Sequence, residues 1–70
     1  MSHLGTIVRN RRVEMGLSLG QLVRLVGYRN ISKGAKRLTR LEREGVASDD
    51  LLTRVVDALG VELPAVERLL

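Results

Sequence analysis

Residues 16–45 read GLSLGQLVRLVGYRNISKGAKRLTRLEREG, and this stretch carries the strongest fold signal in the chain. Apolar residues recur in it at intervals of three and four, which is the spacing of a buried helix face, whereas a half-buried strand would alternate. Gly16, Gly27 and Gly45 fit the left-handed position that follows the last turn of a helix. The pattern therefore predicts two helices joined by a turn.

The first of these two helices is short. Ser18 is a favourable N-cap for its beginning, and Gly27 follows its end. We expect this helix to turn three apolar side chains towards the core, those of Leu22, Leu25 and Val26.

The second helix has an apolar face and a basic face. Asn30 or Ser32 can cap its beginning, and Gly34 near that end costs about 1 kcal/mol relative to alanine. The apolar face is formed by Ile31, Ala35, Leu38, Leu41 and the adjoining Glu42. On the opposite face, four cations form one exposed stripe: Lys33, Lys36, Arg37 and Arg40.

Helical patterns also flank this stretch. Before Gly16, one apolar face is formed by Leu4, Ile7, Val8 and Met15. After Gly45, Ser48 caps a helix that ends at Gly60 and has a wide apolar face of Leu51, Leu52, Val55, Val56 and Leu59. A last short helix starts at Pro64 and has an apolar side of Val66, Leu69 and Leu70. We therefore predict one all-α domain over residues 1–70, a compact unit of five helices.

The composition narrows the range of functions. Cysteine is absent and His3 is the only histidine, so we expect no disulfide, no metal site, no cofactor and no enzymatic activity. A chain of 70 residues leaves little room for a pocket, and we expect no small-molecule ligand. No apolar run is long enough to span a membrane and the N-terminus lacks the features of a signal peptide, so we expect a cytoplasmic protein.

Charge is distributed unevenly along the chain. Residues 28–45 contain six cations and two acids, whereas residues 46–70 contain two cations and five acids. A basic region joined to an acidic end favours binding of a polyanion at the basic end. The single tyrosine, Tyr28, and the absence of phenylalanine and tryptophan argue against single-stranded nucleic acid, which binds through stacking on aromatic side chains.

Five short motifs, in this order, carry a resemblance to a known family. They are LGTIVRNRRVEMGLS at 4–18, QLVRLVG at 21–27, LTRLEREG at 38–45, LL at 51–52 with ALGV at 58–61, and LL at 69–70. The order resembles that of the Cro/Xre-type helix-turn-helix family, the lambda-repressor-like DNA-binding domains. Two features differ from the family pattern. The spacing from Gly27 to Glu42 is longer, and Leu19 stands where the family often has a glutamine that touches DNA.

The resemblance implies a lambda-repressor-like fold whose third helix enters the major groove of double-stranded DNA. Arg40, Arg37 and Lys36 are then the first candidates for base contacts, since arginine and lysine bind guanine edges. The full set of expected DNA-binding residues is Gln21, Arg29, Asn30, Ser32, Lys33, Lys36, Arg37 and Arg40. For Asn30 and Ser32, capping of the helix explains the residue type equally well.

The remaining charged side chains of the basic region are of two kinds. Arg12 and Glu42 match a family pair, which implies a structural ion pair between the first and third helices. Arg9, Arg11 and Arg43 are interpreted as solvated cations or as contacts to the DNA backbone.

The apolar end of the chain suggests a partner. Five residues exceed what one terminal helix needs to bury, and they form an expected dimer interface: Val61, Leu63, Val66, Leu69 and Leu70. Capping of the monomer core is the alternative. The leading hypothesis is a homodimeric transcriptional regulator, an autorepressor of phage or mobile-element type, that binds an inverted repeat in a promoter. Toxin–antitoxin and anti-CRISPR operons are possible settings. The second hypothesis is a protein-interaction module, an antitoxin or adaptor that uses the apolar C-terminal helix.

Overall fold

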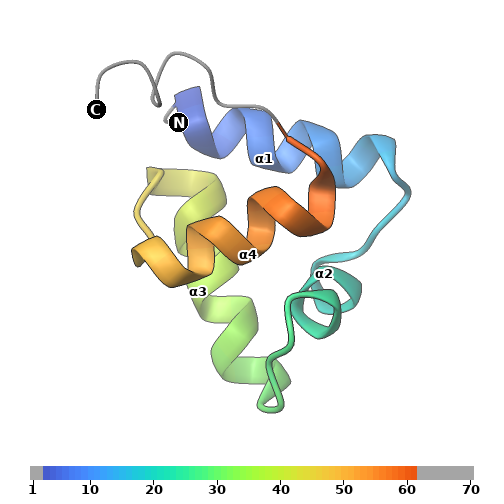
Figure 1. Cartoon of the computed structure of the whole chain (residues 1–70), viewed down its shortest axis with the longest axis vertical. Coiled ribbons are helices and arrows are strands. Elements are labelled where there is room, and N and C mark those ends of the chain that lie inside the picture. Colours follow the sequence, from blue (N-terminus) through green and yellow to red (C-terminus); the bar gives the residue numbers. More distant parts are fainter. Residues whose placement is uncertain (1–2, 62–70) are drawn as a thin grey trace.

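Four helices make up residues 3–61, the part of the chain that this computed structural model describes (Figure 1). They are α1 (His3–Glu14), α2 (Leu19–Leu25), α3 (Ile31–Glu44) and α4 (Asp49–Leu59). No strand occurs within these residues, and none of their helices could cross a membrane. The predicted all-helical class is confirmed for these residues, whereas the fifth helix predicted from Pro64 lies outside them.

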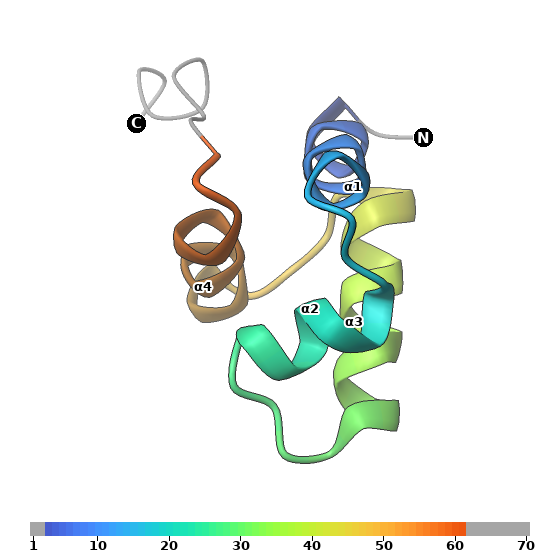
Figure 2. The same cartoon turned by 90° about the vertical axis from the view of Figure 1, so that its right-hand side faces the viewer.

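The longest helix, α3, organises the packing. It lies against both α1 and α2, and α1 also packs on α4. Figures 1 and 2 show α2 lying across α3, with the turn between them at the end of the molecule away from α1. One long face of α3 is therefore covered by the other helices, and its other face is left for solvent.

Local capping sets the helix boundaries. The Ser18 hydroxyl accepts a hydrogen bond from the Gln21 N–H at 3.1 Å, and the Gln21 side chain accepts one from the Ser18 N–H at 2.7 Å. This reciprocal capping box satisfies two backbone donors at the start of α2. Ser48 caps α4 through the Leu51 N–H at 3.2 Å. Gly16, Gly27, Gly45 and Gly60 all adopt positive φ, which confirms the predicted helix ends.

The core is aliphatic, and it corrects two predictions. Leu25 is 54% exposed, and Val23 is the α2 residue that is fully buried instead. Met15 is 40% exposed because α1 ends at Glu14, so Met15 lies in the turn that follows. The buried apolar residues are Val8, Leu22, Val23, Val26, Leu38, Leu41, Leu51, Val55 and Leu59. They come from all four helices, and this shared core fixes the position of α3.

Gly34 explains why Val23 points inwards. A Cβ added at Gly34 would lie 2.5 Å from Val23 Cγ1 and 2.9 Å from Tyr28 Cγ, closer than carbon atoms can approach. The missing side chain therefore lets α2 and the following turn pack directly on the first turns of α3. The helix-propensity penalty of this glycine is offset by close packing between the two helices.

Candidate nucleic-acid interface

The four cations of the predicted stripe lie on the open face of α3. Gly34, Leu38, Leu41 and Glu42 are buried on its other face. Ile31 and Ala35 are partly buried and pack on the core, as the spacing predicted. The side chains of the stripe are all exposed: Lys33, Lys36, Arg37 and Arg40. The predicted buried and exposed faces of α3 are therefore both confirmed.

Partners within the protein divide the stripe into two kinds of cation. Arg40 Nε lies 3.2 Å from Glu44 Oε2, and the guanidinium of Arg37 lies over the Tyr28 ring, 5.9 Å from its centroid. Lys33 and Lys36 have no ion pair with any residue in 3–61. Both lysines can therefore meet an anion without first leaving another charged group. An exposed pair such as Arg40–Glu44 is worth at most about 1 kcal/mol, so Arg40 can also exchange its partner.

The rotation of α3 about its own axis is fixed by a bidentate ion pair. Arg12 Nε donates to Glu42 Oε2 at 2.7 Å, and Arg12 Nη2 donates to Glu42 Oε1 at 3.1 Å. The remaining terminal nitrogen of Arg12 donates to the Leu17 carbonyl at 2.9 Å. The pair expected between α1 and α3 is thus present, and Glu42 is only 5% exposed. A paired carboxylate on the covered face keeps the basic stripe directed outwards.

The start of α3 is set by Asn30. Its side-chain oxygen accepts a hydrogen bond from the Lys33 N–H at 3.0 Å, so Asn30, and not Ser32, is the N-cap. Helix α3 begins at Ile31, directly after this cap, and runs for 14 residues. The interval from Gly27 to Glu42 therefore consists of a short turn, residues 28–30, followed by the first part of α3. Lys33 and Lys36 lie on its first two turns.

Replacing Asn30 by alanine should lower the free energy of unfolding by about 1 kcal/mol, because the Lys33 N–H loses its acceptor. Asn30→Asp should leave the stability close to that of the parent, since a carboxylate accepts the same hydrogen bond and suits the helix N-terminus. Urea denaturation followed by circular dichroism measures both. Equal losses in the two variants would contradict a capping role.

The other expected contact residues have mixed positions. Arg29 and Ser32 are exposed beside the start of α3. Gln21 is also exposed, but its carbonyl oxygen is already used in the capping box, so only its amide NH₂ is left for a ligand. Val61 packs against the monomer core. The remaining residues of the expected dimer interface lie outside the described part of the chain: Leu63, Val66, Leu69 and Leu70.

Two arginines have structural contacts that the sequence did not reveal. Arg11 Nε donates to the Leu59 carbonyl at 2.9 Å and so ties α1 to the end of α4. Arg54 lies 3.2 Å from Asp50, and its terminal nitrogen reaches the Val26 carbonyl at 3.4 Å. Contacts between a side chain and a distant backbone carbonyl leave no periodic trace in a sequence.

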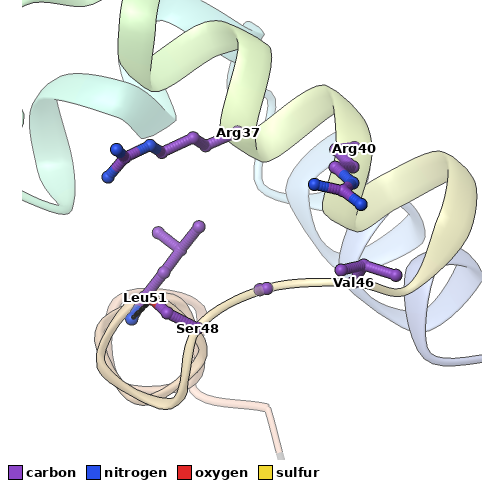
Figure 3. Close-up of a pocket in the computed structure, with 6 residues that line it drawn as sticks. Arg37, Arg40, Val46, Ser48 and Leu51 are labelled. Atoms are coloured by element: carbon purple, nitrogen blue, oxygen red, sulfur yellow. Dashed lines mark hydrogen bonds between the residues drawn. The ribbon is translucent and has the colours of Figure 1, made fainter.

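Hollows flank the basic face of α3 on both sides. On the α4 side, a hollow of about 280 Å³ lies between α3 and the segment that leads into α4. Arg37 and Arg40 border it from α3, and Val46, Ser48 and Leu51 border it from the opposite side (Figure 3). On the α1 side, a groove of about 360 Å³ is bordered by Arg9 and Arg43. Positive charge therefore borders both hollows, from Arg37 and Arg40 of the stripe on the α4 side and from Arg9 and Arg43 on the α1 side.

No match to this chain was found among models of known protein families, among characterised proteins or among solved structures.

Proposed function

We propose that this protein binds double-stranded DNA sequence-specifically by placing α3 in the major groove, and that it regulates transcription as a Cro/Xre-type helix-turn-helix protein. One observation carries the proposal: the exposed cations lie along one side of a helix whose other side is locked into the core by the Arg12–Glu42 pair. A fixed helix with a basic outer face suits recognition because its backbone needs no reordering on binding.

The width of an α-helix matches the width of the major groove of DNA. An α-helix with side chains is about 10–12 Å across, and the major groove of B-DNA is about 12 Å wide. Lys33 and Lys36 are the best-placed residues on the first turns of α3, because no described acid competes for them. Arg40 and Arg37 follow along the same helix and are suited to guanine edges or phosphates. Arg29, Ser32 and the Gln21 amide group are contacts at the periphery.

The proposed assembly is a homodimer on an inverted repeat. Two copies related by a two-fold axis present two α3 helices to successive major grooves, about one helical turn of DNA apart. The apolar residues between Val61 and Leu70 supply the contact between subunits in this arrangement, with Val61 at its edge. Occupation of a promoter by such a dimer blocks transcription by steric exclusion, which makes a repressor the simplest regulator.

Selection from a pool of random duplexes tests the proposal. The protein should enrich an inverted repeat with half-sites about one turn apart, and should bind it more tightly than a scrambled duplex. Lys36→Gln should weaken binding to the selected duplex by about 1–3 kcal/mol, roughly 5- to 150-fold in Kd, because one base contact is lost. Fluorescence anisotropy at fixed salt measures this.

Arg11→Gln is the matched control, since it removes the same charge from α1 on the side that faces α4. It should leave the affinity almost unchanged. Equal affinity for selected and scrambled duplexes would refute a sequence-specific regulator. Absence of binding even at low salt would leave the protein-interaction module as the better proposal.

A further inference from the structure

The groove on the α1 side of α3 contains two arginines without an acidic partner. Arg9 enters it from α1 and Arg43 from α3, and both side chains are exposed. Within residues 3–61, Arg11, Arg40 and Arg54 each pair with a carboxylate, whereas Arg9 and Arg43 have no ion pair. These two arginines can therefore bind an external anion without breaking an ion pair to a described residue.

The other charges in this groove cancel. Arg12 and Glu42 also line it, but their bidentate contact uses the carboxylate and the guanidinium on each other. The groove thus has two net positive charges, both carried on flexible side chains at its border. Thr39 also lines the groove, and its half-buried hydroxyl is a hydrogen-bond donor. Two guanidinium groups and a hydroxyl around one hollow suit a tetrahedral oxyanion.

The position of the groove relative to the basic stripe selects the anion. Thr39 and Arg43 also border a neighbouring hollow, together with the paired Arg40 and Glu44, so the groove adjoins the outer face of α3. A helix of about 10–12 Å fills a major groove of about 12 Å, and its two edges then face the sugar–phosphate strands that border that groove. With α3 in this position, the arginines at its α1 edge would face the DNA backbone and not base edges.

We propose that Arg9 and Arg43 clamp one backbone phosphate of the DNA duplex, with the Thr39 hydroxyl as an additional donor. This inference rests on the proposed function and adds a contact that is independent of DNA sequence. The clamp contributes affinity and fixes how deeply α3 enters the groove, while the stripe reads the bases. The clamp gives a common role to two arginines that belong to different helices, α1 and α3.

The test compares the double variant Arg9→Gln/Arg43→Gln with the parent on two duplexes of about 20 base pairs, the selected one and one of mixed sequence. Affinity is measured over a series of salt concentrations. Loss of one phosphate contact should reduce the slope of log K against log salt by about 0.9. Affinity for both duplexes should fall by the same factor, so the ratio between them should stay constant.

Two further variants make the result specific. Arg11→Gln should keep the parental slope, because Arg11 lies on the opposite side of α1 beside Leu59. Arg9→Lys/Arg43→Lys retains both charges and should restore most of the slope, which also guards against an effect of misfolding. An unchanged melting temperature of Arg9→Gln/Arg43→Gln completes this control, since the side chains of Arg9 and Arg43 are both exposed.

The outcomes separate the two proposals. If the parent binds DNA and the double Gln variant keeps its slope, the clamp is wrong and the proposed function stands. If the ratio between the duplexes falls, the arginines read bases and the clamp is again wrong. If the parent binds neither duplex at low salt, both proposals fail.

Discussion

Arg12→Met is expected to lower the free energy of unfolding by about 3–5 kcal/mol, because it leaves the Glu42 carboxylate buried without its counter-charge. Glu42 is 5% exposed, and both of its oxygens accept hydrogen bonds from Arg12. Methionine keeps most of the length of the side chain, so the variant removes the charge with little loss of packing. The same change also removes the donor to the Leu17 carbonyl.

The effect is large relative to the whole stability of the domain. The free energy of unfolding of small proteins is about 5–15 kcal/mol, and that of a 70-residue chain with a thin core belongs to the lower part of this range. Arg12→Met should therefore be partly unfolded at room temperature. Urea titration by circular dichroism gives the free energy of unfolding, and the parent measured in the same way is the reference.

Two matched variants show whether burial is the cause. Arg40→Met breaks the Arg40–Glu44 pair, which is a single exposed contact at 3.2 Å, and should cost less than about 1 kcal/mol. The double variant Arg12→Met/Glu42→Leu removes both buried charges and should be clearly more stable than Arg12→Met alone. If Arg12→Met weakens DNA binding with no loss of stability, the structural role assigned to the pair is wrong.

Helix boundaries and the two faces of α3 could be predicted because they depend on local signals. Ser18 and Ser48 cap through N–H groups three residues ahead, and Gly45 ends α3 with a φ of 71°. The apolar face of α3 repeats over 14 residues, long enough for the helical period to be unambiguous. Short helices carry less of this information. In α2, seven residues did not distinguish Val23 from Leu25 as the buried side chain.

The candidate site was predictable in outline and less so in detail. The stripe and the Arg12–Glu42 pair were both expected, the pair through the family resemblance. The division of the stripe into paired and unpaired cations was not predicted, although a glutamate four residues after Arg40 indicates an ion pair on a helix. The juxtaposition of Arg9 and Arg43 depends on how α1 crosses α3, which no local pattern specifies. The relative position of helices that are distant in the sequence could therefore not be predicted.

That crossing depends on Gly5, and Gly5→Ala is expected to lower the free energy of unfolding by about 3 kcal/mol. A Cβ at this position would overlap the carbonyl oxygen of Glu42 and would lie 2.7 Å from the carbonyl oxygen of Leu41. Both are backbone atoms of α3, so the two helices must separate to admit a methyl group. The preference of helices for alanine, about 1 kcal/mol, is too small to compensate.

Gly20→Ala is the matched control for this substitution. Gly20 is also a helical glycine, but a Cβ there meets nothing within 4 Å. The same chemical change should therefore stabilise the protein at Gly20, by up to about 1 kcal/mol, and destabilise it at Gly5. Urea denaturation of both variants gives the two signs. A stabilising Gly5→Ala would mean that α1 does not approach α3 as closely as described.

The close approach at Gly5 also carries Arg12 to Glu42, so the two predicted effects should not be independent. Separation of α1 from α3 lengthens the bidentate contact and admits water to the Glu42 carboxylate. Arg12→Met should consequently cost less in the Gly5→Ala background than in the parent, with a coupling energy of about 0.5–3 kcal/mol. Additive losses would instead show that the ion pair and the helix crossing are maintained separately. Coupled losses would mean that one glycine on α1 sets the orientation of the basic face on α3.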